Sequence, residues 1–413
     1  MARLLVRSLA QLATPAGNGP LPRRGRELAS VEVLEDAFVL CDHGRIEAVG
    51  RMRDLGQLGG QLDGVDELDA SGLCAIPGLV DCHTHPAFGG DRVEEFSLRA
   101  AGANYEDLHA AGGGILSTVS ATRALGEDGL RDRAARHAGW MLRHGTTTWE
   151  GKSGYGLDHD TELASLRAVA AAGGSPTWLG AHAVPPEAPD ADAYLEFALT
   201  EVLPEAADLA DAADVFLERG AFDAAQARRF LEACREARLA LRLHGDQFTE
   251  SGAIPLAIDL AARSVDHLEA TGPEGVAALA ASSVVGVLLP ASALFLDRPM
   301  PPARMLADAG AAIALATDFN PGSSFTTSLP FVCSLACTQL HLSPAEALSA
   351  VTVNAAHVLG AGDRVGRIAP GLEADLVLLD APDWRYLAYH LAGEIVAAVV
   401  KHGEVVTGAN LRV

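Results

Sequence analysis

The chain has 413 residues, of which 49% are hydrophobic, enough for one large core and a smaller second domain. Its 31 basic and 54 acidic residues give a net charge of -23. This excess argues against nucleic acid or an anionic membrane as a partner, because both attract basic surfaces. The six cysteines form no C-x-x-C pair, and no stretch reaches the roughly 18 apolar residues of a membrane span. We therefore expect a soluble protein in the cytoplasm.

Short strand-like runs lie at both ends of the chain. Near the N-terminus they occupy residues 4–6, 32–34, 38–40 and 46–50, with a turn signal at 42–45. Near the C-terminus, residues 374–380 and 395–406 are also rich in β-favouring residues. We predict that residues 1–75 and 361–413 together form one small β-sandwich domain, with the middle of the chain inserted between them.

The middle of the chain, residues 76–360, alternates short apolar runs with longer amphipathic segments. Helical patterns cover 127–142, 161–172 and 224–237. The strand candidates are 76–85, 146–150, 176–182, 214–218, 239–244, 264–267, 284–289 and 313–318. Eight strands with intervening helices favour a closed (β/α)8 barrel over an open sheet. The predicted class is therefore α/β, with a TIM-like barrel.

Polar residues recur at the C-terminal ends of these predicted strands, where barrels of this class place their chemistry. They are His83 and His85, His182, Glu218, His244, His267 and Asp318. His83 and His85 are two residues apart, so on a strand both imidazoles project from one face. An isolated His-x-His is as typical of a polar strand end as of a metal site. With His244 and Asp318 added, the pattern indicates a catalytic metal site that keeps one position open for water.

Several longer strings accompany this pattern and extend over nearly the whole chain. They are HPAFGGDR at 85–92, GGGILST at 112–118, KSGYGL at 152–157, GAHAVPP at 180–186 and ATDFNPGS at 316–323. With the His-x-His, the later histidines and Asp318, the chain resembles the imidazolonepropionase family of the metal-dependent amidohydrolase superfamily.

The resemblance implies hydrolysis of 4-imidazolone-5-propanoate to N-formimidoyl-L-glutamate, a step of histidine degradation, and a homodimer. It implies one Zn²⁺ or Fe ion per chain, held by His83, His85, His244 and Asp318. Asp318 is also suited to take a proton from the attacking water and pass it to the leaving ring nitrogen. His267 would polarise the carbonyl or stabilise the oxyanion. Whether Asp318 or His267 is the general base stays open.

The same resemblance implies the residues that hold the small anionic substrate. Arg92 would pair with the propionate, because a guanidinium fork matches a carboxylate. Gln247 stands where some members have glutamate, and it is expected to accept a hydrogen bond from a ring N–H. The remaining expected contacts are Tyr105, Tyr155 and His182, with Asn320, Gly322 and Ser323 at the border of the pocket.

Two other functions remain open at this stage. One is a related deaminase or cyclic-amide hydrolase acting on another azole or purine-like ring, although such a neutral ring needs no Arg92. The other is a non-catalytic scaffold, which the complete ligand set disfavours. Lys152 is similar to the carbamylated lysine of two-metal amidohydrolases but follows the second predicted strand instead of the fourth. Glu218 does end the fourth strand, so a second metal there also stays open.

Overall fold

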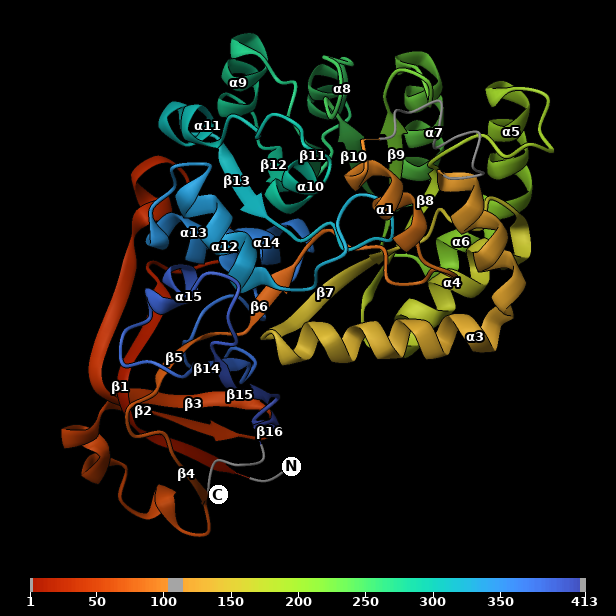
Figure 1. The fold of residues 1–413 in the computed structure, drawn as a ribbon. Coiled ribbons are helices and arrows are strands. Elements are labelled where there is room, and N and C mark those ends of the chain that lie inside the picture. Colours follow the sequence, from red (N-terminus) through yellow and green to blue (C-terminus); the bar gives the residue numbers. More distant parts are fainter. Residues whose placement is uncertain (1–2, 103–113, 409–413) are drawn as a thin grey trace.

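The computed structural model describes residues 3–102 and 114–408, and its larger part is an eight-stranded parallel barrel sheet (Figure 1). Neighbouring strands follow chain order throughout. They are β6 (Leu79–Asp81), β7 (Thr146–Lys152), β8 (Ser175–Ala181), β9 (Ala212–Leu217), β10 (Ala240–Gly245), β11 (Ser264–His267), β12 (Val285–Leu288) and β13 (Ala312–Leu315). The predicted (β/α)8 architecture is confirmed.

The barrel closes just beyond its first and last strands. Thr84 forms a parallel bridge with Phe319. The His85 N–H donates to the Phe319 carbonyl at 2.8 Å, and the Asp318 N–H donates to the His83 carbonyl at 3.0 Å. The backbone hydrogen bonds that close the barrel therefore also fix the three expected metal ligands His83, His85 and Asp318 next to one another.

Helices cover the outside of the barrel (Figure 1). Several begin at a side-chain cap that satisfies free backbone N–H groups, such as the capping boxes Asp223/Gln226 of α7 and Ser343/Glu346 of α13. The helices of the barrel are α1 (Val93–Ala100), α3 (Ile115–Arg143), α4 (His159–Ala171), α5 (Ala191–Phe197), α6 (Leu203–Leu209), α7 (Ala224–Glu236), α8 (Ala253–Asp259), α9 (Pro273–Ala280), α10 (Pro290–Phe295) and α11 (Ala303–Ala309). A π-helical turn, η3 (Ala198–Val202), joins α5 to α6, and α12 (Leu329–Thr338), α13 (Pro344–Ala350), α14 (Val353–Val358) and α15 (Tyr386–Tyr389) follow the last strand.

The two chain ends meet in a second sheet beside the barrel (Figure 1). Its strands are β1 (Leu4–Pro15), β2 (Val31–Asp42), β3 (Arg45–Arg51), β4 (Asp66–Asp69), β5 (Cys74–Pro77), β14 (Leu376–Leu379), β15 (Val396–Lys401) and β16 (Glu404–Thr407), with the short helices η1 (Gly25–Ala29) and η2 (Met52–Leu62). The ends pair directly, because β5 lies antiparallel to β14. The pairing of both ends is thus as predicted, although β4 and β5 run parallel to β1.

Several predicted strands were wrong in extent. The single strand expected over 76–85 is two strands, because β5 belongs to the terminal sheet and β6 to the barrel. They separate at Gly78, whose N–H donates to the Asp375 carbonyl at 2.8 Å. A Cβ on Gly78 would lie 2.2 Å from Thr147 Oγ1, so the crossover needs glycine. In the terminal sheet, residues 32–34 and 38–40 belong to the single strand β2.

No helix within the described ranges is long and apolar enough to cross a membrane.

Candidate metal centre

The first two histidines of the centre lie just past β6, which ends at Asp81. His83 and His85 are 0% and 2% exposed, and their ring centroids are 5.4 Å apart. Cys82, between them, is fully buried on the other side, in a cluster with α14 residues such as Ala355 and Val358. The expected alternation of side chains therefore holds, and Cys82 is a core residue.

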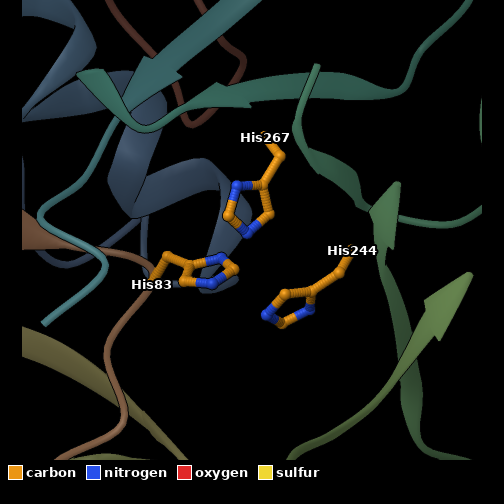
Figure 2. A group of neighbouring side chains, drawn as sticks. All are labelled: His83, His244 and His267. Carbon is orange, nitrogen blue, oxygen red and sulfur yellow. The ribbon is translucent and has the colours of Figure 1, made fainter. Parts of the chain in front are cut away.

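Two later strands bring His244 and His267 to the same point. Figure 2 shows their rings converging with that of His83; the ring centroids of His244 and His267 lie 4.4 and 5.7 Å from the His83 centroid. Asp318 Oδ1 is 3.5 Å from Nε2 of both His83 and His85. One donor atom from each of His83, His244 and His267 fits within 4.8 Å, and the same holds for His83, His85 and Asp318. The donors thus form two overlapping groups that share His83.

Carboxylates behind two of the rings determine which ring nitrogen is free. His83 Nδ1 donates to Asp266 Oδ2 at 2.5 Å, and His244 Nδ1 donates to Asp214 Oδ1 at 3.1 Å. A proton on Nδ1 leaves the lone pair on Nε2, which is the arrangement that metal-binding histidines adopt. His83 Nε2 is buried and has no hydrogen-bond partner in the described part of the chain. This buried, unpaired acceptor beside an aspartate oxygen fits a bound metal ion.

The protonation states favour the same conclusion. Burial lowers the pKa of His83 well below its usual value and that of His244 to about 4. Burial alone would raise the pKa of Asp318, but its hydrogen bond with His85 and the nearby histidines lower it to about 2. Near neutral pH the two rings are therefore neutral and Asp318 is ionised. These are the forms in which these groups bind metals.

Asp318 is held in place by the turn that follows it. Its φ of 53° lies in the left-handed region, which non-glycine residues seldom adopt. The Asn320 side chain donates to the Asp318 carbonyl at 2.6 Å and to Ser323 Oγ at 2.7 Å, and it accepts from the N–H groups of Gly322 and Ser323 at 2.8 Å each. Ser323 Oγ in turn donates to Asp318 Oδ2 at 3.2 Å. In this structure Asn320 and Ser323 orient Asp318.

His182 and Tyr155 form a wall beside His85. The His182 ring centroid is 5.8 Å from that of His85 and 5.2 Å from that of Tyr155. His182 Nδ1 donates to the Gly154 carbonyl at 2.9 Å, so its Nε2 remains available. The loop carrying Tyr155 is organised by the buried carboxylate of Glu162, which accepts N–H bonds from Gly154, Gly156 and Leu157.

Arg92 already has a carboxylate partner. Its Nε and Nη2 donate to Glu95 at 2.8 and 2.6 Å, and the Arg92 side chain is 15% exposed. A Cβ on Gly322 would lie 2.3 Å from Arg92 Nη1, so the guanidinium packs against the turn after Asp318. The structure therefore places Arg92 near the centre, with its guanidinium paired to the Glu95 carboxylate.

Three other residues were expected in the site, and the outcome is different for each. Gln247 lies half-buried in the turn after β10. Glu218 accepts N–H bonds from Arg219, Phe248 and Thr249 at 2.8 to 3.2 Å and so anchors that turn. Its oxygens are used by the loop, which leaves no support for a second metal on Glu218. Tyr105 lies outside the described residues.

A buried group of charged residues lies beneath the histidines, and the sequence patterns did not predict it as a group. Its members are Glu150, Lys152, Asp214, Arg242 and Asp266, each at most 1% exposed. They lie in β7, β9, β10 and β11, inside the barrel. The signal was present, because charged residues inside otherwise apolar strands of a buried barrel need partners.

Comparison with known proteins agrees with this geometry. The model of the amidohydrolase family matches residues 74–406. An imidazolonepropionase from Rubrobacter xylanophilus is 59% identical over 97% of both chains, and one from Chloroflexus aggregans is 46% identical over 98% of both.

Solved structures of low sequence identity share the fold. A zinc-bound adenosine deaminase from Xanthomonas campestris aligns with a TM-score of 0.69 at 20% identity, covering 100% of this chain and 94% of that one. Guanine deaminase from E. coli aligns with a TM-score of 0.67 at 15% identity, covering 98% of this chain and 99% of that one. With the family match and the whole-length relatives, these findings place the chain in the amidohydrolase family, among its imidazolonepropionases.

Proposed function

We propose that this protein hydrolyses 4-imidazolone-5-propanoate to N-formimidoyl-L-glutamate. The observation that carries the proposal is the convergence of His83, His85, His244 and Asp318 in a chain that is 59% identical to an imidazolonepropionase over 97% of its length. The overall reaction adds one water and cleaves one C–N bond of the ring.

The donors suit one Zn²⁺ or Fe ion per chain, held by His83, His85, His244 and Asp318. When bound, such an ion polarises a carbonyl group and lowers the pKa of water. The charges of the site agree with a divalent ion. Among the buried side chains around the donors, the acidic ones (Glu150, Asp214, Asp266 and Asp318) outnumber the basic ones (Lys152 and Arg242).

Asp318 is the proposed proton carrier. Its Oδ1 faces the Nε2 atoms of His83 and His85, while Ser323 Oγ holds its Oδ2 at 3.2 Å. An ionised carboxylate in this position can accept a proton from the attacking water and deliver it to the ring nitrogen as the C–N bond breaks. The turn built by Asn320 keeps the carboxylate aligned for both transfers.

His267 is the proposed stabiliser of the oxyanion that forms when water adds to the carbonyl. Its Nδ1 lies 3.4 Å from Glu269 Oε1. Burial lowers the pKa of His267. The Glu269 carboxylate and the nearby Asp318 and Asp266 raise this pKa by more, so the net shift is upward. A raised pKa favours the protonated ring, whose positive charge and N–H can stabilise an oxyanion.

The substrate would lie between these groups and the wall of Tyr155 and His182. The propionate is proposed to bind Arg92 through Nη1, since Glu95 occupies Nε and Nη2. Tyr155 and His182 would contact the bound molecule, as would Tyr105, and Gln247 would accept from a ring N–H. Gly322 would border the pocket through its backbone.

The direct test is turnover of imidazolone propionate, followed by loss of its ultraviolet absorbance. Guanine and a hydantoin serve as controls for the deaminase and cyclic-amide alternatives. We expect turnover of the imidazolone alone, and elemental analysis should find about one metal per chain. Turnover of guanine or the hydantoin without the imidazolone would replace the proposal by one of these alternatives. Elemental analysis would also distinguish zinc from iron.

We also propose a homodimer, as the family resemblance implies, and a cytoplasmic location. All six cysteines are free, which is consistent with a reducing compartment. Light scattering of the purified protein tests the dimer, and a mass of one chain would contradict it.

A further inference from the structure

Lys152 lies at the end of β7, with its ammonium group fully buried beneath the histidines. Its Nζ is 2.7 Å from Asp214 Oδ2, 2.9 Å from Glu150 Oε2 and 3.8 Å from Asp266 Oδ2. The side chains of all four residues are 0% exposed. Three carboxylates thus surround a single ammonium group that is shielded from bulk solvent.

Two of these carboxylates are the ones that orient metal ligands. Asp214 uses Oδ2 for Lys152 and Oδ1 for Nδ1 of His244, at 3.1 Å. Asp266 Oδ2 accepts a hydrogen bond from Nδ1 of His83 at 2.5 Å. The same oxygen lies 3.8 Å from Nζ of Lys152. One lysine therefore connects two relays, each consisting of a carboxylate and a histidine, that come from different strands.

We propose that Lys152 is a positioning residue that links the Asp214–His244 and Asp266–His83 pairs and thereby sets the affinity of the centre for its metal. A buried carboxylate is stable only where a charge or donor compensates it. Lys152 supplies that charge to both, so each carboxylate stays fixed as an acceptor for its histidine. Both Nε2 lone pairs then point to one place.

Arg242 provides a matched control. It is also buried and positively charged, and it contacts Glu150 of the same group. Its other hydrogen bonds go to Thr177 Oγ1 at 3.0 Å and the Val358 carbonyl at 3.3 Å. Removing Arg242 therefore removes a buried charge that makes no hydrogen bond to the acceptors of His83 or His244 within the described residues, although this charge also favours the ionised form of Asp266.

The inference rests on the metal centre of the proposed function but not on the substrate. The test loads full-length protein with Zn²⁺, challenges it with increasing chelator and measures retained zinc by elemental analysis. Lys152→Met should raise the apparent Kd for Zn²⁺ about tenfold, at the lower end of the range for groups that support metal ligands. Lys152→Gln, which keeps a donor for Asp214, should lie between Lys152→Met and wild type. Arg242→Met should change the Kd less than about twofold, although it lowers thermal stability.

A double-mutant cycle separates positioning from general destabilisation. If Lys152 acts through Asp214, Lys152→Met should have a smaller effect on zinc retention when Asp214→Asn is already present. Equal zinc loss in Lys152→Met and Arg242→Met, or additive effects in the cycle, would overturn the inference. Failure to hydrolyse imidazolone propionate would reject the proposed substrate while leaving a selective Lys152 effect on zinc intact.

Discussion

The barrel interior and the core of the terminal sheet are both buried, yet they are filled by different kinds of side chain. Beneath the histidines the barrel holds five charged side chains that are at most 1% exposed. The core of the terminal sheet is aliphatic, with residues such as Leu9, Val39, Leu376, Leu378 and Val400. Buried charges are costly unless paired, so the comparison indicates that the barrel accepts this cost to orient metal ligands. The terminal sheet contributes stability through apolar burial.

The largest expected effect lies in the barrel. Asp318→Asn removes both an expected ligand and the proton acceptor, and we expect kcat to fall at least about 10⁴-fold, or about 5 kcal/mol. Steady-state kinetics on imidazolone propionate measure it, with circular dichroism to confirm folding. Ser323→Ala, which keeps the carboxylate, should cost much less. Activity within tenfold of wild type in Asp318→Asn would exclude Asp318 as proton carrier.

In the terminal sheet the expected effect is on stability. Leu378→Ala leaves a cavity in the core and should lower the free energy of unfolding by about 4 kcal/mol. The kinetic constants at 25 °C should remain those of wild type, because this core, as far as the structure describes the chain, includes none of the site residues. Val406→Ala, at a side chain that is 43% exposed, is the control and should change stability by less than about 0.5 kcal/mol. A changed kcat in Leu378→Ala would show that the two regions are coupled.

Arg92 tests the edge of the barrel site. If it binds the propionate, Arg92→Ala should lower kcat/KM by roughly 2–4 kcal/mol, and Arg92→Lys should recover only part because an ammonium lacks the planar fork. Glu95→Gln distinguishes two possible roles of Glu95, which pairs with Arg92. A raised KM would mean that Glu95 positions Arg92, and a lowered KM that it competes with substrate. Unchanged kinetics in Arg92→Ala would place the propionate elsewhere.

The smallest effect is expected at Gln247. Gln247→Leu leaves a ring donor unpaired and should lower kcat/KM by about 1–3 kcal/mol. Gln247→Glu should remain active with a shifted pH–rate profile, because a new titrating group lies near the ring. Full activity of Gln247→Leu combined with an inactive Gln247→Glu would mean that Gln247 acts only as a neutral spacer.

Local sequence patterns were enough to predict the strands and helices of the barrel. They also predicted the strand ends at which the polar residues lie. Strands and helices have different hydrophobic periods, so the seven later barrel strands were found within a few residues of their observed ends. Because parallel strands end together, the polar residues after them were expected to meet, and His83, His85, His244, His267 and Asp318 do meet.

The partners of these residues depend on contacts between segments that are far apart in the chain. Asp266 and His83 are 183 residues apart and Lys152 and Asp214 are 62 apart, so barrel closure alone brings them together. The ion pair between Arg92 and Glu95 depends on side-chain conformations that hydrophobic periodicity does not encode. The same holds for the hydrogen bonds that a loop donates to Glu218. The break at Gly78 likewise arises from the close approach of Thr147, a contact between segments far apart in the chain. Local patterns fix where a side chain points, whereas long-range packing fixes what it meets.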